Sequence, residues 1–296
     1  FQVMTRLFVL LATLLLPCIA THTPVVLWHG MGDSCCNPLS MGSVKKMLEK
    51  ELDGAYVLSL MIGDSIASDT TNGFFMDVNA QIDFACNVIQ KDQNLQNGYN
   101  AMGFSQGGQF LRGLAQKCPQ PPMKQLISVG GQHQGVYGFP HCPGSWFVCK
   151  EVDKLLDLGA YTDYVQNHLV QAQYWHDPLN EEKYRKHSKF IADVNQEVTL
   201  NPTYKQNLMR VSNITFIMFN RDTMVIPKES EWFGFYKPGQ AKELMTLQES
   251  DIWKQDKLGL REMNFQGRLS FLKIESDHLR VPEAFWTDEI IPRLKN

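Results

Sequence analysis

One short motif constrains this chain more than any other feature: residues 103–107 read Gly-Phe-Ser-Gln-Gly, the pattern Gly-x-Ser-x-Gly. The apolar run at 99–102 indicates a buried strand before it, and apolar residues at helical spacing over 110–114 indicate a helix after it. A sharp turn from strand to helix at such a motif lifts a serine hydroxyl to the edge of a sheet. The motif alone has weak specificity, but here it lies in the structural context that the chemistry requires. Ser105 is therefore the candidate nucleophile.

The rest of the chain alternates between short strand-like runs and stretches of helical periodicity. The predicted strands, rich in branched and aromatic residues, are 25–28, 56–60, 99–102, 126–129, 214–219 and 269–274, and a final helix is expected near Pro282 to Leu294. This alternation is typical of a mostly parallel sheet covered by helices. Together with the motif at a strand-to-helix turn, it predicts the α/β-hydrolase fold, with one catalytic domain over residues 21–296.

The alternation stops from about Gly130 to Ser212. This segment is rich in Gln, Tyr, His and Gly and has no clear strand of its own. An insertion of this length is usually a lid or a binding subdomain. We therefore expect an insertion subdomain within the catalytic domain.

A serine hydroxyl needs a base, and in this fold the chain order is serine, then acid, then histidine. Of the eight histidines, only His278 follows the last predicted strand, where loops face the same sheet edge as Ser105. Asp222 follows the strand 214–219 and is the predicted orienting carboxylate. Asp277 is the immediate neighbour of His278, but adjacent residues that leave a strand point in different directions. The predicted catalytic residues are therefore Ser105, Asp222 and His278.

Hydrolysis of a carbonyl compound by a serine also requires N–H groups that bind the oxyanion. These normally come from the residue after the nucleophile and from the loop after the first core strand. Gln106 and Met31 occupy those places and are the predicted oxyanion-hole residues. His29, in the same loop as Met31, is expected to be structural, because the fold already supplies a base elsewhere.

Composition excludes some partners and cofactors. Charged residues make up 20 % of the chain and the net charge is −3, so no basic surface is expected to hold nucleic acid. No cysteine pair has Cys-x-x-Cys spacing, and we predict no metal and no cofactor. The expected ligand is a small or lipid-like molecule.

The first twenty residues predict a cleaved signal peptide. Arg6 is followed by an apolar run over residues 7–16 and then by small residues that end at Ala20. A transmembrane anchor is the alternative, but the run is short for a bilayer span, so we expect none. Asn213, in Asn-Ile-Thr, is the predicted glycosylation site of a protein that follows the secretory route.

An even number of cysteines remains after the signal peptide, which fits an oxidising compartment. These six are Cys35, Cys36, Cys86, Cys118, Cys142 and Cys149. The last two bracket a short loop and should pair, and the middle two lie late in successive predicted helices. The first two are adjacent, so either a strained vicinal disulfide or a pair of free thiols remains open.

Several long stretches of the sequence resemble those of a known family. They are residues 26–41, which include Trp-His-Gly-Met-Gly-Asp-Ser-Cys-Cys-Asn-Pro-Leu-Ser, and residues 98–116, 128–136, 174–178 and 230–236. These blocks resemble the lysosomal palmitoyl-protein thioesterases, specifically type 1, and the likeness runs from about Pro24 to Pro292. Blocks of this length are far more specific than the serine motif.

The resemblance implies a function for each part of the chain. It implies hydrolysis of long-chain fatty acyl thioesters on cysteines of S-acylated proteins, in the lysosome or after secretion, with Ser105, Asp222 and His278 as the triad. It also implies that the insertion helps to bind the acyl chain, and Tyr174 and Trp175 are the candidate walls of that groove. Ordinary core packing is the alternative for Trp175.

Without the resemblance, the residues leave two other functions open. A secreted lipase or carboxylesterase would use the same triad and oxyanion hole, and no residue type separates a thioester from an oxygen ester. A catalytically inactive binding protein of the same fold is disfavoured because all three triad positions are filled. The preference for a thioester therefore rests on the resemblance.

Overall fold

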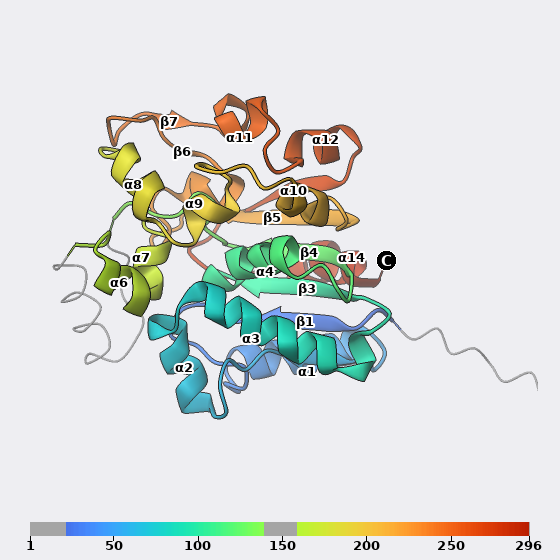
Figure 1. Cartoon of the computed structure of the whole chain (residues 1–296). Coiled ribbons are helices and arrows are strands. Elements are labelled where there is room, and N and C mark those ends of the chain that lie inside the picture. The colour runs from blue at the N-terminus through green and yellow to red at the C-terminus, as the bar shows by residue number, and fades with distance from the viewer. Residues whose placement is uncertain (1–21, 139–158, 296) are drawn as a thin grey trace, which may run out of the picture.

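A central sheet with helices on both faces forms the frame of the molecule (Figure 1). The computed structural model describes residues 22–138 and 159–295, and the statements that follow concern these residues. The predicted signal peptide, Cys142 and Cys149 lie outside the described residues.

The sheet has six strands in the order β2-β1-β3-β4-β5-β8, and every neighbouring pair is parallel. The strands are β1 (Val25–Trp28), β2 (Val57–Ser59), β3 (Tyr99–Phe104), β4 (Met123–Val129), β5 (Asn213–Phe219) and β8 (Leu269–Ile274). The predicted parallel sheet and the α/β-hydrolase fold class are confirmed. Strand β2 is shorter than the predicted 56–60, and β3 extends two residues beyond the predicted end.

The strand order places a switch point in the middle of the sheet. From β1 the chain moves to β2 on one side and then returns to β3 on the other. In parallel sheets the carboxyl ends of two strands that diverge in this way leave a crevice between their loops. The loop with His29 follows β1 and Ser105 follows β3, so both lie at this crevice.

Alternate residues of the strands supply two separate hydrophobic cores, one on each face. In β1, Val26 and Trp28 belong to one core, while Val25 and Leu27 belong to the other. This follows from the two-residue period of a strand. Both faces are covered, which explains why the strands are continuous apolar runs rather than alternating ones.

The helices divide between the two faces. The first core is covered by α3 (Val78–Lys91), α4 (Gln106–Lys117) and α10 (Pro202–Leu208), which lie over one face of the sheet in Figure 1. The second is covered by α1 (Met41–Glu51) and by the C-terminal segment α13 (Glu283–Phe285), η4 (Trp286–Ile290) and α14 (Ile291–Lys295). The predicted final helix is therefore three consecutive helical pieces, of which η4 is a π-helix.

The segment between β4 and β5 contains only short helices among its described residues. They are α6 (Asp163–His168), α7 (Val170–Gln173), α8 (Glu181–His187), α9 (Ile191–Val194) and α10. Figure 1 shows α6 and α7 beyond one end of the strands rather than over a face of the sheet. This part of the insertion therefore stands beside the loops that carry the candidate site.

The remaining elements are short. They are α2 (Ile66–Phe75), η1 (Gln93–Leu95), η2 (Lys228–Trp232), β6 (Phe235–Tyr236), β7 (Leu244–Met245), η3 (Leu247–Glu249), α11 (Asp251–Lys254) and α12 (Leu260–Phe265). The strands β6 and β7 form a separate antiparallel pair. Among the described residues, no helix combines the length and apolar character that a membrane crossing needs.

Two disulfides join described cysteines. Cys86, in α3, is bonded to Cys118, which caps the C-terminus of α4, and the bond closes a loop of 32 residues. A crosslink of this span stabilises the fold mainly by restricting the unfolded chain. Cys35 and Cys36 are bonded to each other, so the vicinal pair that the sequence left open is a disulfide in the structure.

Candidate active site

Ser105 lies in the turn between β3 and α4. Its φ is 52° and its ψ is −125°, a backbone conformation that residues with a Cβ rarely adopt. Its N–H donates to the carbonyl of Val129, at the end of β4, over 2.8 Å. Backbone strain of this kind persists only where the surrounding structure holds it, and it is the conformation of a nucleophile elbow.

The two glycines of the motif are required by close packing. A Cβ at Gly107 would lie 2.3 Å from the carbonyl oxygen of Trp28, and a Cβ at Gly103 would lie 2.4 Å from the carbonyl oxygen of Gly107. No side chain fits at either position without moving backbone. The motif is therefore fixed by the approach of α4 to β1 and β3, and that approach positions Ser105.

His278 follows β8 and Asp222 follows β5, as the strand ends predict. Nδ1 of His278 lies 2.5 Å from Oδ2 of Asp222, and the side chain of Asp222 is fully buried while that of His278 is 11 % exposed. Oδ1 of Asp222 accepts the N–H groups of Met224 and Val225 over 2.7 and 2.8 Å. Asp222 is thus held on one side by the backbone and bonds His278 on the other.

The neighbouring Asp277 is directed elsewhere. Its Oδ1 accepts the backbone N–H of His278 over 2.8 Å, and both the N–H and the hydroxyl of Thr223 over 3.1 and 3.0 Å. These bonds lower the pKa of Asp277, chiefly through the backbone N–H of His278. Asp277 joins the two loops but does not contact the imidazole ring through any of these bonds.

The charge of Asp222 is stabilised by its surroundings. Burial by itself would raise the pKa of Asp222, but hydrogen bonds from His278 and Glu231 hold that pKa below its ordinary value. Asp222 is therefore a carboxylate near neutral pH. A carboxylate at Nδ1 fixes the imidazole tautomer that presents the unprotonated Nε2 to a serine.

The predicted oxyanion donors lie on either side of Ser105. Gln106 is the first residue of α4, so its N–H has no carbonyl acceptor within the helix and lies at the positive end of the helix dipole. Met31 follows β1, and the adjacent Gly30 is so near that a Cβ there would lie 3.2 Å from Cβ of Ser105. The structure thus brings both loops to the serine.

A buried pair of His29 and Asp69 holds the loop of Met31. Nε2 of His29 lies 3.0 Å from Oδ1 of Asp69, and Nδ1 lies 2.8 Å from the carbonyl oxygen of Gly30. Oδ2 of Asp69 accepts the N–H of Cys35 over 2.8 Å. His29 is therefore a structural residue of the loop, as predicted, and Asp69 ties the start and the end of that loop to α2.

Ser105 and His278 face one pocket of about 560 Å³, within the usual range for small-ligand sites. Most of its lining residues come from the loop after β1, the loops after β5 and β8, and the C-terminal segment. From the insertion, the described lining residues are Gln132, Val136 and Tyr174. The described part of the insertion thus reaches the pocket at these three residues.

The two predicted acyl-binding aromatics occupy different places. Tyr174 lines the pocket, and its hydroxyl donates to the side-chain oxygen of Gln106 over 3.2 Å. Trp175 is not among the lining residues; its ring packs against Tyr137 at a centroid distance of 5.5 Å and against the first core. For Trp175 the geometry favours the alternative of core packing. The predicted glycosylation site, Asn213, is exposed at the start of β5.

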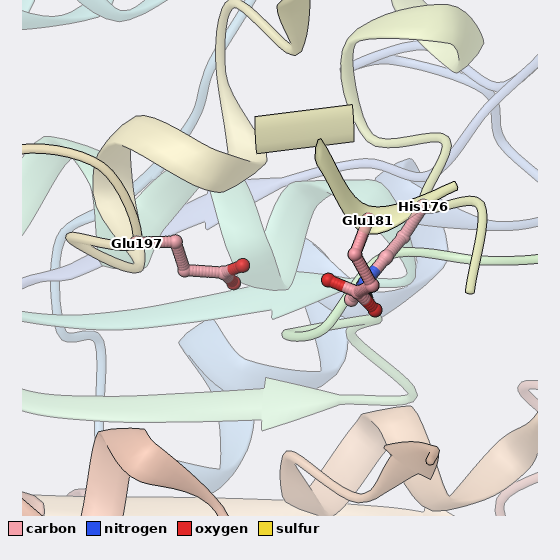
Figure 2. A group of neighbouring side chains, drawn as sticks. All are labelled: His176, Glu181 and Glu197. Atoms are coloured by element: carbon pink, nitrogen blue, oxygen red, sulfur yellow. Dashed lines mark hydrogen bonds and ion pairs between the residues drawn. The ribbon is translucent and has the colours of Figure 1, made fainter. Parts of the chain in front are cut away.

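Another group of titratable side chains lies on the insertion. Figure 2 shows His176, Glu181 and Glu197, each of which offers a side-chain atom within 4.8 Å of the other two. Nε2 of His176 lies 2.9 Å from Oε1 of Glu181, whose Oε2 accepts from Arg185 over 3.1 Å, and Nδ1 lies 2.8 Å from the carbonyl oxygen of Gln134. Protein partners thus explain the arrangement of His176 and Glu181, and we assign this group a structural role.

Two acidic residues next to the site could not be identified from the sequence. Asp69 holds the loop of Met31, and Glu231 contacts Asp222. Neither belongs to a motif with recognisable spacing. No signal in the sequence indicates which acidic side chain faces the site.

Comparisons with known proteins show which family the chain resembles. Residues 24–278 match the family model described as palmitoyl protein thioesterase. The chain is 52 % identical over 272 residues to palmitoyl-protein thioesterase 1 of Caenorhabditis elegans, covering 92 % of this chain and 91 % of the relative. It is 33 % identical to palmitoyl-protein thioesterase 3 of Dictyostelium discoideum, covering 97 % and 98 % of the two chains.

A more distant relative is the lysosomal thioesterase PPT2 homolog of Drosophila melanogaster, 27 % identical over 89 % of each chain. The family match spans most of the sequence and includes the segments of all three predicted catalytic residues. The resemblance in the sequence is thereby confirmed. The chain belongs to the palmitoyl-protein thioesterase family and is a thioester hydrolase with the α/β-hydrolase fold.

Proposed function

We propose that the protein hydrolyses long-chain fatty acyl thioesters on cysteines of S-acylated proteins, with Ser105, His278 and Asp222 as its catalytic triad. The observation that carries the proposal is the strained serine turn and the His278–Asp222 pair at one pocket. The name of the 52 % identical relative supports the palmitoyl substrate class.

The chemistry requires two steps. Ser105 Oγ attacks the thioester carbonyl while His278 Nε2 takes the hydroxyl proton, and the N–H groups of Met31 and Gln106 bind the oxyanion. The bond to sulfur breaks, the leaving thiolate receives the proton from His278, and an acyl ester of Ser105 remains. Water then attacks this ester with His278 as base, which releases the fatty acid and restores Ser105.

The described pocket suits such a substrate. Its wall combines the reacting groups with apolar side chains, among them Val44, Leu279, Val281 and Trp286. Burial of each methylene contributes about 0.8 kcal/mol, so an apolar wall of this kind favours a long acyl chain over a short one.

The test compares two substrates with the same palmitoyl group, one a thioester of a cysteine peptide and one an oxygen ester of the matching serine peptide. We expect a much higher kcat/KM for the thioester, measured as released thiol against released fatty acid. A preference for the oxygen ester would instead identify a lipase or carboxylesterase. Ser105→Ala, assayed in parallel, controls for contaminating hydrolases.

For the location we propose the lysosome or secretion. The support is the signal-like first twenty residues and the lysosomal names of relatives such as the Drosophila protein. The test is the N-terminal sequence of the mature protein from cells together with its distribution between lysosomal fraction and medium. An uncleaved N-terminus in the cytosolic fraction would contradict the proposal.

A further inference from the structure

A third buried carboxyl group lies behind the Asp222–His278 pair. Glu231 belongs to η2, and the residue is 1 % exposed. Its Oε2 accepts the N–H of Phe219, the last residue of β5, over 2.9 Å. Its Oε1 is buried and has no hydrogen-bond donor among the described residues. A buried acceptor that lacks a hydrogen-bond donor destabilises the folded protein, so the surroundings of Oε1 need an explanation.

The explanation is the neighbouring carboxyl group. Glu231, Asp222 and His278 each offer a side-chain atom within 4.8 Å of the others, so the buried carboxyl group of Glu231 lies beside that of Asp222. Two ionised carboxylates this close in a buried site repel each other, and both can only accept hydrogen bonds. One of them therefore carries a proton.

The hydrogen bonds decide which group carries it. Asp222 accepts two backbone N–H groups and contacts the imidazole of His278, and bonds of this kind favour a carboxylate. Glu231 accepts one backbone N–H. Burial, the contact with Asp222 and the negative charge of Glu229 raise the pKa of Glu231 well above its ordinary value.

We propose that Glu231 is a positioning residue of this active site: it is a neutral carboxylic acid whose Oε1–H donates to Asp222. The inference rests on the proposed triad. Through this bond Glu231 holds the Asp222 carboxylate in the orientation that meets His278 Nδ1. It also stabilises the negative charge of Asp222 without placing a second charge beside it.

The decisive variant is Glu231→Gln. A glutamine places its carbonyl oxygen toward the N–H of Phe219 and its amide nitrogen toward Asp222, so it reproduces both bonds without a titratable proton. We expect kcat/KM near that of the wild type at neutral pH. We also expect wild-type activity to fall at the alkaline pH at which Glu231 ionises, and this fall to be absent from Glu231→Gln.

A second variant removes the donor. Glu231→Leu should lower kcat by about 10- to 100-fold in protein that circular dichroism shows to be folded, because one hydrogen bond to a charged group is lost. Glu229→Gln, on the same short helix, removes a charge without touching Asp222 and should remain close to the wild type. A loss in Glu231→Gln as large as in Glu231→Leu would overturn the proposal.

The proton itself is measured without substrate. Infrared difference spectra between wild type and Glu231→Gln should show the carbonyl stretch of a protonated carboxylic acid in the wild type at neutral pH. Only carboxylate bands in that difference would refute the neutral acid. This readout separates the two proposals, since an enzyme without thioesterase activity would still report the state of Glu231.

Discussion

Asp222 Oδ2 and His278 Nδ1 lie 2.5 Å apart although 56 residues separate them in the chain. Adjacent parallel strands produce this contact, because β5 and β8 end side by side and each passes directly into the loop that carries one of the two residues. Asp277, next to His278 in the sequence, bonds backbone and Thr223 instead.

The first prediction concerns these two aspartates. Asp222→Asn should lower kcat by about four orders of magnitude, as in the serine protease case, because the amide favours the wrong imidazole tautomer. Asp277→Asn should cost far less, since it alters a bond between loops. The measurement is single-turnover and steady-state hydrolysis of a palmitoyl thioester by folded variants. The opposite ranking would transfer the orienting role to Asp277.

The second prediction concerns the nucleophile. Ser105→Ala should abolish turnover with little change in stability, because only the hydroxyl that forms the acyl-enzyme is removed. A serine-directed phosphonate should label the wild type at Ser105 and leave the variant unlabelled, as mass spectrometry of peptides can show. Ser212→Ala, at an exposed serine, is the control and should behave as the wild type. Substantial activity in Ser105→Ala would end the proposed mechanism.

The third prediction concerns acyl-chain length. Each added methylene should raise kcat/KM by about fourfold until the apolar wall is covered, after which the rise stops. Met224→Ser should reduce kcat/KM more for long chains than for short ones, because Met224 lines the pocket. Trp175→Phe, at a position outside the lining, should leave the chain-length profile unchanged. Equal values for two-carbon and sixteen-carbon substrates below micellar concentrations would contradict the groove.

The fourth prediction concerns the buried pair His29–Asp69. Burial opposes charge on both residues, but their hydrogen bond and mutual attraction raise the pKa of His29 above 6.5 and lower the pKa of Asp69 below 3.8. The pair therefore contributes its full stabilisation of the fold between pH 3.8 and pH 6.5. It declines as pH rises through the raised pKa of His29 or falls through the lowered pKa of Asp69.

Asp69→Asn should accordingly lower the free energy of unfolding by about 3 kcal/mol near pH 5, and by less at alkaline pH, where His29 is neutral. Denaturant unfolding at several pH values measures this difference. Asp83→Asn, at an exposed position of α3, is the matched control and should have little effect at any pH. A loss that is the same at acidic and alkaline pH would mean that the pair is not ionised.

The fifth prediction concerns the cysteines. The native mature protein should contain no titratable thiol, because the described disulfides use four cysteines and Cys142 is predicted to pair with Cys149. A chromogenic thiol reagent, applied before and after denaturation without reductant, measures this directly. Two reactive thiols that map to Cys142 and Cys149 would show that this pair does not form.

The sequence alone was sufficient to locate the three residues that we propose as nucleophile, base and acid. Ser105 lies in a motif whose glycines are required by backbone contacts at 2.3 and 2.4 Å, so the local sequence records the turn. Asp222 and His278 could be located because parallel strands carry the residues at their carboxyl ends to one edge. The positions of these residues depend on strand order and chain direction, which the periodicity of the sequence indicates.

Only the tertiary structure decided which side chains support that site. The roles of Asp69 and Glu231 depend on contacts between elements that are distant in sequence, and their chemistry depends on burial, which no motif encodes. The same limit explains why Tyr174 lines the pocket while its neighbour Trp175, which is partly buried and packs against the first core, does not: adjacent residues of one segment point in different directions. A sequence specifies which residues follow a strand, but the packing of loops and helices determines what each side chain meets.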